Sequence, residues 1–230
     1  MLKVPLPFGH SFSHWHSVLP ATGNCCVLDT TPRIDCNMFR SVNAPMNSTT
    51  FTLDVLQSGL ATVLASPKDD GTLEHVVSRP GVGLREVKLE AMLDETVGLV
   101  GDHWTQRGSS RTPDGGPNPN AQVTIMNSRS IALVAGSRDR WQLAGDQLFV
   151  DLDISCDNLP PGTRLAIGGA EIEVTAEPHT GCAKFLERFG KDALQFVNSA
   201  DGRQLRLRGA NARVIRGGPI RVGDRVTKAR

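Results

Sequence analysis

The sequence predicts a β-rich fold of mixed α+β class, and three observations predict it. Short apolar runs after Phe51 are separated by Gly, Pro, Asp and Asn, which is typical of strands joined by turns. Many of these runs alternate apolar and polar residues, as half-buried strands do. In the C-terminal part of the chain, one stretch has the period of 3.6 residues that indicates an amphipathic helix.

The first 45 residues lack such a pattern. They carry prolines, three histidines and two adjacent cysteines, but no sustained period of 2 or 3.6 residues. We therefore expect residues 1–45 to be a disordered extension and residues 46–230 to be the domain. A metal site built from His14, His16 and Cys25–Cys26 is the alternative, but this spacing matches no common ligand set.

The first part of the domain contains three recognisable segments. His75–Ser78 is expected to be a strand. Val87, Leu89 and Ala91 alternate with charged residues, which predicts a half-buried strand. The segment Gly108–Asn120 is rich in Gly, Pro and Asn and predicts a loop long enough to cover a site.

A strand and a short helix are expected next. Val123–Met126 is the strand. Ser128 is a suitable N-cap for a helix that carries Ile131 and Val134 on adjoining turns, and Gly136 is a suitable end.

Further strands are expected in the C-terminal part, each with alternating apolar and polar residues. They are Leu148–Leu152, Ile172–Ala176, Leu205–Arg208, Ala212–Ile215, Ile220–Val222 and Arg225–Thr227. The segments Leu159–Gly162 and Gly168–Gly169 are expected to be turns. Arg216–Pro219 is expected to close a hairpin between the two strands that flank it.

The composition excludes several classes of protein. Lys and Arg number 25 against 24 Asp and Glu, so no global charge favours nucleic acid or an anionic membrane, and any anion site must be local. No apolar run approaches the roughly 20 residues that span a bilayer, and no secretory leader is apparent. The five cysteines are too irregular for a disulfide framework, which indicates reduced thiols. We expect a cytoplasmic protein.

Cys182 lies where the chain turns from a strand into the predicted amphipathic helix. The helix has apolar residues at the spacing i, i+3, i+4 and i+7, and Gly190 is expected to end it. The apolar residues at this spacing are Cys182, Phe185, Leu186 and Phe189. Free backbone N–H groups at a helix start stabilise a thiolate, and His179 and Lys184 lie close by in sequence. The alternative is that Cys182 is simply a small apolar residue of the helix face.

Arginines are concentrated near the C-terminus. Seven lie between residues 203 and 225: Arg203, Arg206, Arg208, Arg213, Arg216, Arg221 and Arg225. On the predicted strand, Arg206 and Arg208 share one face, and their planar guanidinium groups suit a compact anion such as phosphate. The alternative is a solvated sheet face on which the arginines pair with Asp201 and Asp224.

These C-terminal residues resemble the MOSC family, named for the C-terminal domain of molybdenum-cofactor sulfurase. Successive blocks match in order: Gly145–Leu148, Leu159–Leu165, Glu177–Lys184, Arg208–Val214, Gly217–Gly218 and Val222–Asp224. The segment Gly98–Trp104 resembles the first block of the same family. The resemblance covers about Arg79 to Val226.

The resemblance implies a β-barrel-like fold with a few peripheral helices and an essential cysteine, here Cys182, in a pocket. In family members that bind molybdopterin, this cysteine coordinates molybdenum. In sulfur-transfer members it is proposed to carry sulfur as a persulfide. His179 and Lys184 are the nearest candidates to assist Cys182.

The resemblance also implies where the cofactor is held. The pterin phosphate is the natural anion for the region of Arg208 and Arg213. Arg79 and Arg85 correspond to the basic segment that holds the cofactor in related proteins, although Pro80–Gly83 does not closely match its motif.

Three functions follow from the resemblance. The first is a molybdenum-dependent oxidoreductase that reduces N-hydroxylated or N-oxide compounds with electrons from a partner protein, since no Gly-x-Gly-x-x-Gly fingerprint is present. The second is a carrier of sulfur or molybdenum cofactor that uses a Cys persulfide, supplied by a separate desulfurase that holds pyridoxal phosphate. The third is a non-catalytic interaction domain. No nucleic-acid or membrane partner is expected.

Overall fold

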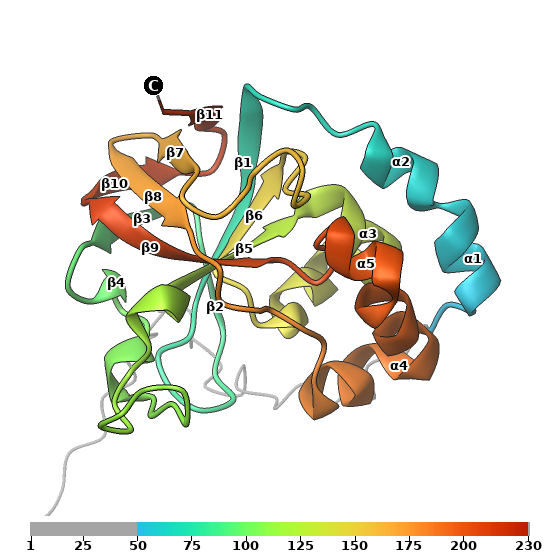
Figure 1. Cartoon of the computed structure of the whole chain (residues 1–230), viewed down its shortest axis with the longest axis horizontal. Coiled ribbons are helices and arrows are strands. Elements are labelled where there is room, and N and C mark those ends of the chain that lie inside the picture. Colours follow the sequence, from blue (N-terminus) through green and yellow to red (C-terminus); the bar gives the residue numbers. More distant parts are fainter. Residues whose placement is uncertain (1–49, 230) are drawn as a thin grey trace, which may run out of the picture. The chain divides into compact units, whose positions relative to one another are not determined.

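The computed structural model describes residues 50–229 (Figure 1). The predictions made for residues 1–45, including those on His14, His16 and Cys25–Cys26, lie outside the described residues. Among residues 50–229, no helix is both long enough and apolar enough to cross a membrane.

The centre of the domain is a closed barrel of seven strands. The strands are β1 (Gly71–Ser78), β5 (Val123–Asn127), β6 (Leu148–Asp151), β7 (Arg164–Ile167), β8 (Ala170–Val174), β9 (Ala210–Arg216) and β11 (Arg225–Lys228). Their order around the barrel is β1-β11-β7-β8-β9-β5-β6, and β6 pairs with β1 to close it. Only β5 and β6 run parallel; the other pairs are antiparallel. The predicted β-rich, barrel-like fold is confirmed.

Four short strands lie outside the barrel. β2 (Glu86–Lys88) extends β1, while β10 (Gly218–Arg221), β3 (Glu90–Asp94) and β4 (Gly98–Leu99) form a separate three-stranded sheet.

The helices gather on one side of the barrel (Figure 1). They are α1 (Leu53–Ser58), α2 (Leu60–Leu64), α3 (Ser128–Ala135), α4 (Ala183–Asn198) and α5 (Ala200–Gln204). Three 3₁₀ helices complete the set: η1 (Trp104–Gln106), η2 (Pro119–Ala121) and η3 (Arg138–Ala144).

Two hydrophobic cores result from this arrangement. One fills the barrel, with Leu73, Ile125, Val150, Leu165, Ile172 and Ala212 among its members. The other joins the barrel wall to the helices, with Leu56, Met126, Ile131, Phe149, Phe185 and Phe189 among its members. Successive apolar residues of β5 and β6 therefore enter different cores, and both strands are buried on both faces.

The strand expected over Val87, Leu89 and Ala91 is wrong in its pairing and burial. The chain forms β2 and β3 in two different sheets, broken at Leu89. Val87 and Leu89 are exposed, at 46% and 75%. Alternation indicated an extended backbone but not whether another layer covers it.

The strand expected over Leu205–Arg208 and the hairpin at Arg216–Pro219 are also wrong. Leu205–Arg208 is a turn after α5, in which Arg206 has a φ of 49°. β9 pairs with β5 and β8, whereas β10 pairs with β3, so the chain passes from the barrel to the small sheet. A Cβ at Gly218 would lie 2.4 Å from the Gly169 carbonyl oxygen, so glycine permits this close crossing.

The two helix predictions are confirmed, with a corrected start for the first. Asn127, not Ser128, caps α3, because its side chain accepts from the N–H groups of Arg129 and Ser130. Gly136 ends that helix as expected.

The helix that starts after Cys182 ends at Gly190 as expected, because this residue has non-helical backbone angles, with a φ of 88° and a ψ of 173°. A second helical segment follows this kink directly, and α4 includes both segments. Phe185 and Phe189 are buried, but Leu186 on the expected apolar face is 41% exposed.

Candidate functional site

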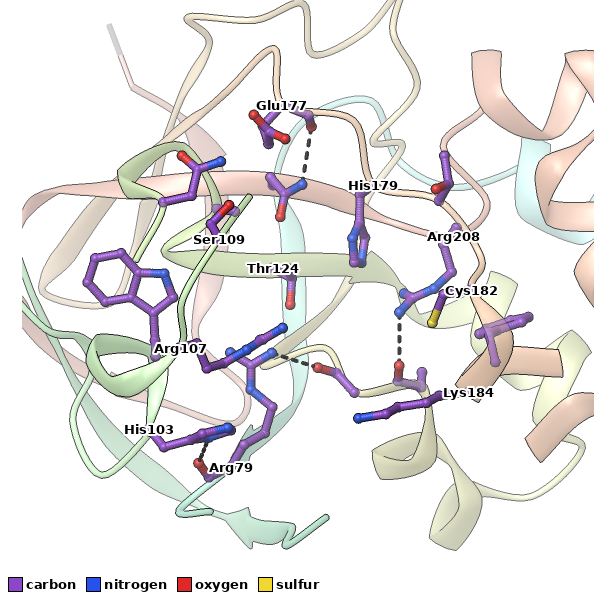
Figure 2. Close-up of a pocket in the computed structure, with 18 of the residues that line it drawn as sticks. Arg79, His103, Arg107, Ser109, Thr124, Glu177, His179, Cys182, Lys184 and Arg208 are labelled. Carbon is purple, nitrogen blue, oxygen red and sulfur yellow. Dashed lines mark hydrogen bonds between the residues drawn. The ribbon is translucent and has the colours of Figure 1, made fainter. Parts of the chain in front are cut away.

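A pocket of about 630 Å³ opens at one end of the barrel (Figure 2). Arg79 directly follows β1, and Gly145 lies three residues before the start of β6. Because β1 and β6 are antiparallel, these residues meet at the same end, where the Arg79 guanidinium donates to the Gly145 carbonyl at 3.1 Å. The predicted loop Gly108–Asn120 contributes Ser109, Arg111 and Asn118 to the lining.

The structure brings together six of the seven residues proposed for the site from the sequence. They are Cys182, His179, Lys184, Arg208, Arg79 and Arg85, and all line the pocket. Arg213 does not. It lies on the outer wall of the barrel, where its half-exposed guanidinium pairs with Glu173 at 2.6 Å.

Cys182 is the N-cap residue of α4 and is exposed, with a free thiol. The segment that leads to it is held at both ends by side-chain amides. Asn198 accepts from the Gly181 N–H and donates to the Gly181 carbonyl, at 2.9 and 3.1 Å. Asn211 donates to the carbonyls of Glu177 and Pro178, each at 3.2 Å. The thiol is therefore presented on a fixed segment rather than on a free loop.

Gly181 lets the segment lie close to α4. A Cβ at this position would lie 2.6 Å from a methyl group of Leu194 and 3.2 Å from the Asn198 amide nitrogen. A side chain here would therefore require the side chain of Leu194 or the segment itself to shift.

Behind Cys182, a buried carboxylate joins two of the predicted residues. Asp146 accepts from the His179 ring Nε2 at 2.7 Å and from the Arg208 guanidinium at 2.5 Å. Its side chain is fully buried, and Arg208 also donates to the Ala144 carbonyl at 2.9 Å and stacks on the Phe185 ring. Arg208 is thus committed to Asp146 rather than free to hold an anion by itself.

Burial would raise the pKa of Asp146, but the Arg208 charge and the His179 ring hold that pKa well below its usual range. Burial also lowers the pKa of His179, and the Arg208 charge adds to this lowering, while Asp146 opposes it without reversing it. At neutral pH the group is therefore an ionised Asp146, a charged Arg208 and a neutral His179.

A second buried pair supports the opposite side of the pocket. Arg79 binds Asp102 through two guanidinium nitrogens, at 2.8 and 3.0 Å, and both side chains are buried. The Arg79 carbonyl accepts from the ring Nδ1 of His103 at 2.5 Å. Arg79 therefore fixes the wall of the pocket.

The remaining charges make the pocket basic. Arg111 is neutralised by Glu177, which joins the long loop to the segment of Cys182. Four further cations line the pocket with no carboxylate of residues 50–229 within salt-bridge distance: Arg85, Arg107, Lys184 and Arg188. Burial and the neighbouring arginines lower the pKa of Arg85 and Arg107, which reflects this crowding of positive charge. A chain of formal net charge +1 thus contains a locally basic pocket.

Several site residues were not identified from the sequence, namely Asp102, Asp146, Arg107, Asn198 and Asn211. Asp146 and Asp102 lie in the blocks Gly145–Leu148 and Gly98–Trp104, whose resemblance to the family was the only signal available. No sequence pattern pointed to Asn198 and Asn211, because the role of a side-chain amide that holds a backbone segment becomes visible only from its hydrogen-bond partners.

A comparison with family models matches residues 112–227 to the MOSC domain. This match covers half of the chain, and the protein belongs to the MOSC family. No curated protein matches the sequence.

Solved structures share the fold. The YuaD protein from Bacillus subtilis matches with a TM-score of 0.53 and 18% identity, over 68% of this chain and 93% of that one. A hypothetical protein matches with a TM-score of 0.50 and 19% identity, over 71% and 70%. A weaker match, on which the assignment of the fold does not depend, is YiiM from Escherichia coli, with a TM-score of 0.44 and 17% identity, over 69% of this chain and 70% of that one.

Proposed function

We propose that this protein binds the molybdenum cofactor in the pocket, with Cys182 as the metal ligand, and reduces N-hydroxylated or N-oxide compounds. The observation that supports it most is an exposed thiol in the same pocket as four cations that have no carboxylate of residues 50–229 within salt-bridge distance. A thiolate is a soft ligand for transition metals, and cations suit the phosphate of a pterin cofactor.

The pocket fits such a group in size and in ligand supply. Its volume of about 630 Å³ lies within the usual range for cofactor sites. Among residues 50–229, no group of three or more His, Cys, Asp and Glu side chains could hold a metal ion. A metal beside Cys182 would therefore take most of its ligands from the cofactor that carries it.

The residues of this chain would bind the cofactor and hold its ligand in place. Bound molybdenum cofactor would supply the redox chemistry. Lys184, Arg85 and Arg107 would bind its anionic groups, and the Asn198 clamp would keep Cys182 in place. The electrons would come from a partner protein, since the sequence carries no dinucleotide fingerprint.

The exposure of Cys182 supports a second candidate, a carrier that holds sulfur as a persulfide on this thiol. A partner must reach a carrier's sulfur directly, which an exposed position on a clamped segment allows. The sulfur would come from a separate desulfurase that contains pyridoxal phosphate.

Molybdenum, pterin and sulfane sulfur should be measured in protein purified from a host that makes the cofactor. We expect stoichiometric molybdenum and pterin in the wild type and neither in Cys182→Ser, because a hydroxyl of nearly the same volume is a poor, normally protonated ligand. Cys156→Ser is the matched control, since its partly buried thiol lies outside the pocket. Sulfane sulfur on Cys182 without molybdenum would favour the carrier. Retention of molybdenum by Cys182→Ser would contradict the first candidate, and undiminished sulfane sulfur in this variant would contradict the second.

A further inference from the structure

We propose that His179 is the proton-transfer group of this pocket and that Asp146 is the positioning residue that fixes its tautomer. The roles of these two residues are argued from geometry. The identity of the group that receives the proton, an oxygen of the substrate, rests on the proposed function.

The geometry fixes which nitrogen carries the proton. Asp146 is buried between two donors, and one of them, Arg208, has only N–H groups to offer. The two positive or donating neighbours keep the carboxylate ionised by lowering its pKa against the effect of burial. An ionised carboxylate only accepts, so the His179 Nε2 must carry a proton and donate it. The lone pair of the neutral ring is therefore on Nδ1.

The ring is placed where a reacting group would lie. His179 lines the pocket with Cys182 and Lys184, and Figure 2 shows its ring directed into the same space. Its side chain is 17% exposed, so solvent protons can reach it. Arg208 has a second effect: its charge, together with burial, keeps the pKa of His179 below the ordinary value despite the nearby carboxylate. The protonated ring is consequently a stronger acid than a histidine in water.

The charged groups around the ring come from every side of the pocket. Asp146 and Arg208 touch the dyad directly, and Arg79 with its partner Asp102 lies beyond them. The other titratable groups that line the cavity are His103, Arg85, Arg107, Arg188, Lys184, Cys182 and the pair of Arg111 with Glu177. Most of these are positive, which favours release of a proton from the ring.

Gly209 supports the view that this dyad is built into the fold. Its φ is 114°, and a Cβ there would lie 3.0 Å from the His179 Cδ2, 3.3 Å from the Asp146 Oδ1 and 2.6 Å from the Ile125 carbonyl oxygen. The backbone passes against the dyad only because this residue has no side chain. The ring is therefore held by packing on one side and by Asp146 on the other.

The proposed step balances as follows. Reduction of an N-oxide takes two electrons and two protons, breaks the N–O bond, and releases the amine and water. Both electrons would come from the donor protein of the proposed function. His179 takes a proton from solvent on Nδ1 and gives it to the departing oxygen, while its Nε2–H stays hydrogen-bonded to Asp146. A second proton from solvent, taken up on Nδ1 in the same way, serves the second transfer.

The tautomer can be measured in the protein without cofactor, by ¹⁵N NMR of histidine-labelled full-length chain. His179→Gln assigns the resonances among the six histidines. We expect the Nε2–H tautomer in the wild type at neutral pH. In Asp146→Asn, Arg208 attracts the amide oxygen, so the amide NH₂ faces the ring and the tautomer should change to Nδ1–H.

Asp102→Asn is the matched control, because it alters the other buried arginine–carboxylate pair of the pocket and does not touch His179. Its His179 should remain Nε2–H. An Nδ1–H ring in the wild type would overturn the proposal. So would an Asp146→Asn ring with the same tautomer as the wild type.

Turnover by the loaded protein tests the transfer itself. His179→Gln should keep molybdenum but lower kcat by about 10² to 10⁴-fold, with loss of the pH dependence that belongs to the ring. Unchanged kcat in this variant would overturn the proton-transfer role. Absence of molybdenum from the wild type would contradict the proposed function and the N–O step, whereas the positioning role of Asp146 would still be decided by the NMR result.

Discussion

The same chemical pair, arginine with a carboxylate, occurs in two regions of this protein with different surroundings. On the outer wall of the barrel, Arg164, Arg213 and Arg216 pair with Glu171 and Glu173 of β8, and the arginine side chains are about half exposed or more. At the pocket, Arg79 with Asp102 and Arg208 with Asp146 are buried.

The two regions differ in how much the loss of one partner should cost the folded state. On the outer wall, water solvates either partner alone, so each pair contributes little to stability. At the pocket, a partner left alone would be a buried charge without compensation. The outer pairs are a solvated surface, whereas the buried pairs fix the position of the groups around Cys182.

Loss of the carboxylate from the buried pair of Arg79 and Asp102 should give the largest effect. Asp102→Ala leaves Arg79 buried without its carboxylate and should lower the free energy of unfolding by about 3–5 kcal/mol. Urea denaturation at neutral pH measures it. Asp102→Asn keeps an acceptor and should lose less. A loss below about 1 kcal/mol in Asp102→Ala would show that the pair is no different from those on the outer wall.

Arg208→Ala should have a somewhat smaller effect, because His179 remains as a donor to Asp146. We expect a loss of about 3 kcal/mol together with a rise in the pKa of His179, since the positive charge that lowers it is removed. Denaturation and NMR titration measure the two effects. An unchanged pKa would mean that burial alone sets it.

Acid should reduce the stability that the buried carboxylate of Asp146 contributes to the folded state. The folded state holds the pKa of Asp146 below its ordinary value, so the unfolded chain binds more protons at low pH. The stabilisation is complete above about pH 4 and is lost as the pH falls further, with a slope approaching about 1.4 kcal/mol per pH unit for one proton. Asp146→Asn should flatten the curve of unfolding free energy against pH in this range. An equal slope of unfolding free energy against pH in both proteins would show that Asp146 does not cause the loss of stability in acid.

The outer wall should show the smallest effects. Arg213→Ala should change the free energy of unfolding by less than about 1 kcal/mol, because its guanidinium is half exposed. It should also leave molybdenum occupancy unchanged, whereas Lys184→Ala, which removes a cation that lines the pocket, should lower occupancy. Equal losses of molybdenum occupancy in the two variants would indicate that Arg213 also helps to bind the cofactor.

The sequence predicted the local structure better than the pairing. It located the strands at Val123–Met126 and Arg225–Thr227 and the helix that starts after Cys182, because each pattern depends on neighbours within a few residues. It failed at Leu89 and at Arg216–Pro219, because an alternating run does not say which sheet it joins.

By itself, the sequence determined the strand and helix content, the family, and the position of Cys182 at a helix start. The tertiary structure alone decided the rest of the site. Asp146 and His179 are 33 residues apart, and Arg208 is 62 residues from Asp146, yet one buried carboxylate binds both. Whether an arginine belongs to the pocket or to the outer wall depends on burial, and burial follows from the closure of the barrel rather than from any local pattern.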